Sequence, residues 1–118
     1  MNKCMFEAFM FQHHSQYQTL RNVLNDHDIG KIKSAYFNFG FPHRNKEDIR
    51  YNKELGGGAY YDVACYLSKI NSLIVEGTPI KICAFEEESD NYDVDIGGNC
   101  IIRYKNNITC FWDRDWET

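Results

Sequence analysis

Residues 54–66 of this chain read Glu54-Leu55-Gly56-Gly57-Gly58-Ala59-Tyr60-Tyr61-Asp62-Val63-Ala64-Cys65-Tyr66. The three glycines lack a Cβ, so the backbone there can adopt positive φ and come close to a ligand or another chain. Apolar residues then recur at helical spacing as far as Ile74, which predicts a helix that begins at the glycines. Asp62 and Tyr66 are four residues apart, so a helix carries them on one face. This combination indicates a small-molecule site.

The rest of the chain predicts an α+β fold. Alternating and apolar patterns predict strands over residues 4–12, 35–41, 80–86, 94–104 and 108–113. An amphipathic stripe behind a Ser15–Gln18 capping box predicts a second helix over residues 16–27. Residues 42–55 read as a loop, and Asn106-Asn107 as a hairpin turn. We therefore expect an open sheet, mixed or mainly antiparallel, with two helices packed on one face.

Length and charge limit the function classes. A chain of 118 residues suits a single domain, and a hydrophobic content of 43% argues against disorder. The net charge of −4 comes with scattered lysines and arginines, which excludes the basic stripe of a nucleic-acid-binding protein. The sequence also contains no apolar run long enough to span a membrane and no signal-peptide core.

The cysteines and histidines predict neither a disulfide framework nor a metal site. Five cysteines at irregular spacing, without a Cys-x-x-Cys pair, favour reduced thiols in a cytoplasmic protein. His13 and His14 are adjacent, so on a strand they point to opposite faces and cannot chelate one ion together. Near the end of the chain, Trp112 and Trp116 predict an adhesive edge strand and a self-association surface.

Three stretches together resemble the C-terminal domain of the glucose–fructose oxidoreductase / inositol dehydrogenase / MocA family. The glycine stretch resembles its Gly-Gly-Gly-Ala-x-x-Asp-x-Gly-x-Tyr/His signature, with Ala64 at a position where the family often has glycine. Residues 7–16 (EAFMFQHHSQ) resemble the strand that joins the two family domains, although Gln12 and Ser15 depart from the usual arginine and proline. Asp48-Ile49-Arg50 resembles the family's Asn/Asp-Ile/Tyr-Arg.

The resemblance implies an NAD- or NADP-dependent oxidoreductase with a carbohydrate-like substrate and a sheet-mediated homo-oligomer. It makes residues 1–118 one partial C-terminal domain, and we expect a fragment, because the Rossmann-type nucleotide domain and its Glu-Lys-Pro lysine are absent from the sequence. Such a fragment is expected to be inactive alone.

The resemblance also implies the site residues. Tyr66 would be the acid/base, with Asp62 as its catalytic helper. The glycine loop, Gly56, Gly57 and Gly58, would approach the cofactor, while Arg50 and His14 would contact substrate. Each residue has a plainer alternative: a packed helix tyrosine, a helix-capping aspartate, a flexible lead-in and an exposed arginine.

Two further interpretations of the whole chain stay open. The chain is either a non-catalytic module that mediates oligomerisation through its sheet, or a subunit that gains a nucleotide domain from a separate chain.

Overall fold

A computed structural model describes residues 3–26 and 29–116. Two compact units make up the chain, Met1–Lys31 and Ile32–Thr118, and each is described by itself. In the first unit a short 3₁₀-helix, Met10–His13, leads into helix α1, Ser15–Asn25. Helix α1 confirms the predicted second helix up to Asn25, and residue 27 of that prediction lies outside the described residues.

Two predictions for the first unit are wrong. Residues 4–12 do not form a strand, since every strand of the described chain lies between Ser34 and Asp115 and the segment turns on itself instead. An alternating pattern shows which faces are apolar, but a strand also needs a neighbouring strand to hydrogen-bond. The helix cap is His14 rather than Ser15, because the His14 Nδ1 accepts the N–H of Gln16 at 3.1 Å.

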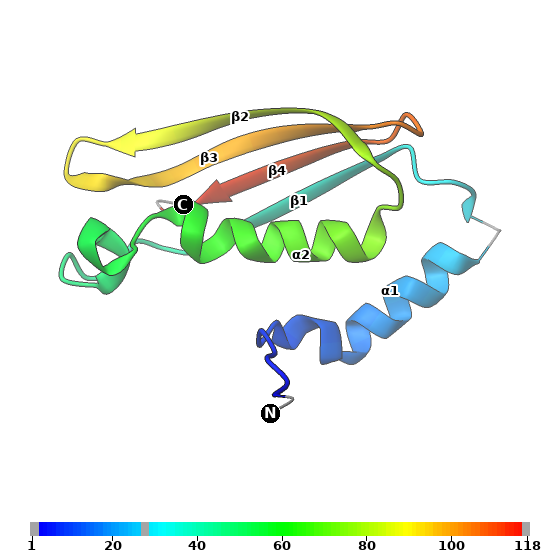
Figure 1. Cartoon of the computed structure of the whole chain (residues 1–118), viewed down its shortest axis with the longest axis horizontal. Helices are drawn as coiled ribbons and strands as arrows, with labels where there is room; N and C mark the ends of the chain where they lie inside the picture. The colour runs from blue at the N-terminus through cyan, green and yellow to red at the C-terminus, as the bar shows by residue number, and fades with distance from the viewer. Residues whose placement is uncertain (1–2, 27–28, 117–118) are drawn as a thin grey trace. The chain divides into compact units, whose positions relative to one another are not determined.

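The second unit contains a four-stranded sheet with the order β1-β4-β3-β2 (Figure 1). The strands are β1 (Ser34–Gly40), β2 (Pro79–Ser89), β3 (Tyr92–Tyr104) and β4 (Thr109–Asp115). β1 pairs with β4 in parallel, whereas β2–β3 and β3–β4 are antiparallel. The predicted open sheet, mixed or mainly antiparallel, is therefore confirmed as a mixed sheet. The turn between β3 and β4 places Asn107 at φ 68°, the left-handed conformation expected there.

One helix lies along a face of this sheet. The glycines lead into a single π turn, Tyr60–Ala64, which continues as helix α2, Cys65–Ile74 (Figure 1). The predicted apolar stripe is buried where it meets the sheet, with Ala59, Val63 and Leu67 each at most 3% exposed. Burial of this stripe holds the start of the helix in place.

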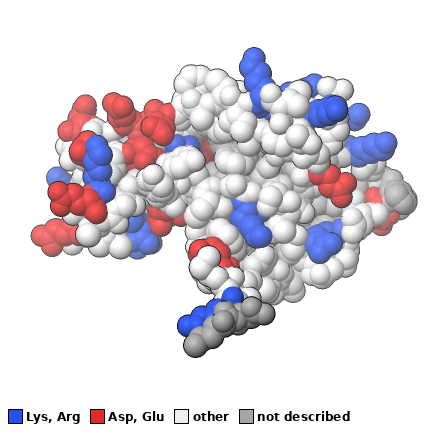
Figure 2. All heavy atoms as spheres, viewed as in Figure 1, with Lys and Arg blue, Asp and Glu red and all other residues white. Residues whose placement is uncertain are grey.

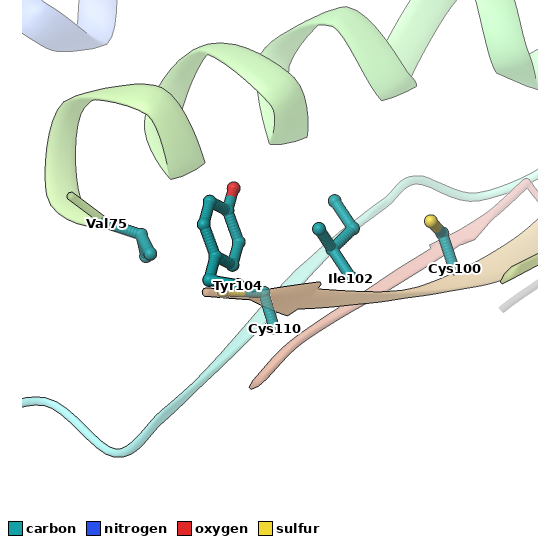
Figure 3. Packing of buried hydrophobic residues seen from close by; sticks show 5 residues of the cluster. All are labelled: Val75, Cys100, Ile102, Tyr104 and Cys110. Carbon is teal, nitrogen blue, oxygen red and sulfur yellow. The ribbon is translucent and has the colours of Figure 1, made fainter. Parts of the chain in front are cut away.

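Two clusters of buried residues fill the space on the helix side of the sheet. The first cluster consists of Val75, Cys100, Ile102, Tyr104 and Cys110, whose side chains lie between α2 and the strands (Figure 3). The Tyr104 hydroxyl accepts the Asn71 Nδ2–H at 2.6 Å, so the buried phenol has a partner. The second cluster consists of Tyr51, Ala59, Val63 and Trp116, below the glycine loop.

The predicted adhesive edge at the end of the chain is wrong. β4 is an inner strand between β1 and β3, and Trp116 is fully buried against Tyr51. The edges of the described sheet are instead β1 and β2. None of the helices in the described part of the chain has the length and apolar character needed to cross a membrane.

Candidate functional site

The glycine loop folds back on the preceding segment of its own chain. Gly57 N donates to Asn52 O and Gly58 N donates to Arg50 O, both at 2.9 Å. A Cβ on Gly57 would lie 2.8 Å from Asn52 O and even nearer to Arg50 O, which is too close for any side chain. Gly56 sits at φ 77° with open space around it. The loop therefore needs glycine to pack against residues 50–52, and this packing brings it next to Arg50.

Arg50 lies between two carboxylates. Its Nε donates to Asp62 Oδ2 at 2.8 Å, and its Nη1 donates to Asp48 Oδ1 at 3.0 Å. Within the described residues its Nη2 makes no hydrogen bond. Two residues predicted for separate roles, Asp62 as catalytic helper and Arg50 as substrate contact, thus form one ion pair. The fork of a guanidinium suits such two-sided pairing.

These contacts alter the proton affinities of the cluster. The backbone N–H of Arg50 donates to Asp48 and, with the Arg50 guanidinium, lowers the pKa of this carboxyl below its ordinary value. Hydrogen bonds to Asp48 and Asp62 raise the pKa of Arg50 further above its already high value. The site thus presents a fixed cation between two acceptors near neutral pH.

Around this ion pair the surface forms a depression of about 180 Å³. We call it the glycine-loop depression, and it is lined by Ile49, Arg50, Gly56, Gly57, Tyr61 and Asp62. Four of the predicted site residues therefore meet at one place. The third glycine of the loop, Gly58, is buried beneath it.

Tyr66 lies one turn further along the chain, in α2, whereas Asp62 lies in the π turn. The predicted shared face assumes a regular α-helix, and the π turn interrupts that regularity between the two residues. The half-buried Tyr66 ring packs against Phe39 of β1, with ring centroids 5.4 Å apart. His14 belongs to the first unit, where it caps α1.

Three charged residues of this region escaped the sequence analysis as site residues. Asp48 is the N-cap of a short 3₁₀-helix, Ile49–Tyr51, and this role becomes apparent only in the structure. Asp95 and Arg114 come from β3 and β4 and reach the start of the π turn, so no local pattern connects them with the glycines. Acidic side chains gather at the nearby β2–β3 end of the unit, where Glu86, Glu87 and Glu88 are exposed (Figure 2). The surroundings of the depression are therefore acidic rather than basic.

The described residues hold no group of three or more His, Cys, Asp or Glu side chains arranged for a metal ion. All five cysteines lie in the described part of the chain and are free, with Cys100 and Cys110 buried. A fixed arginine, its two carboxylate partners and a close-packed glycine loop suit the recognition of hydroxyl groups, which both donate and accept hydrogen bonds.

Comparisons with known proteins identify the family of the chain. The chain is 30% identical over 105 residues to the dTDP-3,4-didehydro-2,6-dideoxy-alpha-D-glucose 3-reductase of Actinomadura kijaniata, covering 89% of the chain and 32% of that enzyme. It is 26% identical over 115 residues to the D-xylose 1-dehydrogenase (NADP(+)) 2 of Haloferax volcanii, covering 97% and 35%. The chain thus spans about a third of the length of these curated relatives.

A solved structure matches as well. The crystal structure of a 3-ketoreductase from Actinomadura kijaniata, in complex with NADP and TDP-benzene, has a TM-score of 0.83 and 28% identity, covering 97% of this chain and 35% of that protein. Residues 17–118 match the GFO/IDH/MocA C-terminal domain. The chain therefore belongs to the GFO/IDH/MocA family, whose C-terminal domain these residues match.

Proposed function

We propose that this chain is the substrate-side portion of an NAD(P)-dependent oxidoreductase that interconverts a hydroxyl and a carbonyl on a sugar, sugar-nucleotide, polyol or diol carbon. The observation that carries the proposal is the Arg50–Asp62 ion pair, 2.8 Å long, held against the glycine loop. The relatives named above, a dTDP-sugar reductase and a xylose dehydrogenase, support this substrate class.

In this proposal Arg50 and Asp62 bind and orient substrate hydroxyls. The Nη2 of Arg50 has donor capacity left within the described residues, and Asp62 can accept at its carboxylate while it holds the guanidinium. Gly56 and Gly57 line the same depression. Fixing the reacting carbon in this way lowers the entropic part of the barrier.

Tyr66 is the proposed proton donor and acceptor. When bound, a nicotinamide cofactor would supply or accept the hydride. The phenol Oη of Tyr66 would hold the proton that the substrate oxygen gains or loses, which is ordinary general acid–base work. Packing against Phe39 fixes the direction of the ring.

The size of the depression supports a role that needs more protein than this chain. Its volume of about 180 Å³ is below the roughly 300–1,000 Å³ of sites that enclose a small molecule. It fits one edge of a sugar or nicotinamide ring but not a dinucleotide. We therefore propose that the chain alone binds sugar hydroxyls weakly, holds no complete cofactor and is inactive.

Nuclear magnetic resonance on the ¹⁵N-labelled chain tests this. D-xylose at millimolar concentration is expected to shift the amides of Arg50, Gly57 and Asp62, and Asp62→Asn to abolish the shifts. The control Asp93→Asn alters an exposed carboxylate outside the depression and should leave the response unchanged. NADPH is expected to give no saturable heat in calorimetry. Sugar shifts that persist in Asp62→Asn, or are absent from the parent chain, contradict the proposal.

A second function, self-association through the sheet, has its own observation. Ile102 faces α2 and is buried, so its neighbour Ile101 faces the opposite side, where it is 42% exposed. Tyr36 and Phe111 stack beside it, with centroids 5.8 Å apart. This apolar row on the sheet face opposite α2 suits a second copy of the chain.

Light scattering after size exclusion tests the self-association. The chain is expected to elute as a dimer or larger, and Ile101→Asp to reduce it to a monomer. Ile82→Asp, a change at an isoleucine of β2 that is 62% exposed on the other face of the sheet, is the control. A monomeric parent chain excludes this function.

A further inference from the structure

The start of the π turn lacks a cap from its own segment. Its N-cap residue is Ala59, whose side chain cannot accept a hydrogen bond. The amide of Tyr60 instead donates to Asp95 Oδ2, at 2.7 Å, across from strand β3. A carboxylate at this place satisfies a free N–H and interacts favourably with the positive end of the helix dipole. The cap of this helix is therefore tertiary rather than local.

Arg114 of the inner strand β4 holds Asp95 from the other side. Its Nη2 lies 3.6 Å from Asp95 Oδ2, and the two side chains are only 4% and 14% exposed. The Arg114 guanidinium carbon also lies 5.6 Å from the centroid of the Tyr60 ring, within cation–π distance. Tyr60 is thus contacted twice, at its amide by Asp95 and at its ring by Arg114.

Two glycines make room for this pair. A Cβ on Gly98 would lie 3.0 Å from Arg114 Nη2, and a Cβ on Gly58 would overlap Asp95 Oδ1. Gly58 has φ 118°, a conformation that L side chains rarely adopt. The third glycine of the loop is therefore fitted to Asp95, and not to the depression above it.

The pair connects by short contacts to the glycine-loop depression. The Asp62 amide donates to Gly58 O at 3.1 Å, so the position of the Gly58–Tyr60 segment determines the position of the Asp62 backbone. Asp62 in turn holds Arg50. We infer that Asp95 and Arg114 are positioning residues that clamp Tyr60 and thereby set the geometry of the Arg50–Asp62 pair. This inference rests on the proposed function only for the use of the depression.

The alternative is that the buried pair merely stabilises the sheet. Removing one partner of such a pair strands a buried charge and destabilises the whole fold, whereas replacing both partners by apolar residues is often neutral. The double variant Asp95→Leu/Arg114→Met therefore separates the two roles. This double variant leaves no unpaired buried charge, but it removes the carboxylate that accepts the hydrogen bond from the Tyr60 amide.

Amide hydrogen exchange on the 118-residue chain provides the test, without any ligand. In the double variant the Tyr60 and Asp62 amides are expected to exchange at least about tenfold faster, while the amides of Ile102 and Cys110 in the central strands keep their rates. The Arg50 Nε–H resonance should also shift or broaden, because Asp62 is no longer held. The control Asp93→Leu removes the exposed carboxylate paired with Lys53 and should change none of these signals.

Three results would overturn the inference. Faster exchange by one common factor throughout the unit would show general stabilisation. Unchanged exchange at Tyr60 would show that the cap is dispensable. Faster exchange at Tyr60 with an unaltered Arg50 Nε–H would show that the clamp does not reach the depression. Because no sugar or cofactor is added, none of these results depends on whether the proposed function is correct.

Discussion

Replacement of Trp116 by alanine tests the assignment of this residue to the core. The Trp116 side chain is fully buried and contacts Tyr51 and Phe41, with ring centroids 5.4 and 5.7 Å away. A tryptophan buries about 150–250 Å², and at about 25 cal/mol per Å² this corresponds to roughly 4–6 kcal/mol. Its Nε1–H has no hydrogen-bond partner among the described residues, and this lowers the stabilisation that burial of the ring provides.

We therefore expect Trp116→Ala to lower the free energy of unfolding by about 3–5 kcal/mol, the usual loss for a buried aromatic ring. At roughly 4 °C per kcal/mol for a domain near this size, the midpoint of thermal unfolding falls by about 12–20 °C. Urea titration followed by far-ultraviolet circular dichroism measures the loss. Leu55→Ala, which truncates a side chain that is 65% exposed, serves as the control and should cost little.

A loss below about 1 kcal/mol for Trp116→Ala would refute the reasoning, because only surface substitutions are that mild. A change in oligomeric state without a change in stability would favour the sequence-based expectation of an exposed, adhesive tryptophan. The two outcomes are distinguished by running light scattering on the samples used for the urea titration.

Three further predictions follow from the site and the core. Gly57→Ala should destabilise the chain by about 1–3 kcal/mol, because its Cβ meets backbone oxygens that cannot move aside. Urea titration should show a smaller loss for Gly56→Ala, whose Cβ meets no atom and whose only cost is the strain of φ 77°. The pKa of Asp48 is lower in the folded chain than in the unfolded chain, where it is about 3.9. The carboxylate therefore stabilises the fold above that pH, and the stabilisation is lost as the pH falls through the lower folded value. Acid titrations of the parent chain and of Asp48→Asn should thus converge as the pH falls below about 4. Burial raises the pKa of the Cys100 and Cys110 thiols, so at pH 8 iodoacetamide should modify the three exposed cysteines first and these two only after unfolding.

The second unit could be predicted well from local patterns. The alternation around residues 35–41 and the glycine-led stripe through Val63 and Leu67 each correspond to an observed element, and the stripe is buried whereas Ala35 and Phe37 of the strand are partly buried. These segments have periodicity, start signals and stop signals that agree with one another. The first unit lacks that agreement, and the predicted strand over residues 4–12 failed because alternation does not reveal whether a partner strand exists.

The candidate site was predictable only in part. The glycine stretch and Arg50 carry a recognisable pattern, and they do meet around one depression. The ion pair that joins Arg50 to Asp62, and the clamp formed by Asp95 and Arg114, depend on how separate strands approach the loop. Trp116 was misplaced for the same reason, since β4 becomes an inner strand only through its pairing with β1.

The parallel pairing of β1 with β4 also determines the order in which this sheet can assemble. Strands β2, β3 and β4 follow one another through short turns, so they can pair through contacts that are local in the sequence. β1 joins them across a separation of 75 residues, as between Asn38 and Asp113, and closing so long a loop is entropically costly. In any state in which β1 is not yet docked, β4 has an open edge that carries aromatic side chains, and such an edge can pair with another chain.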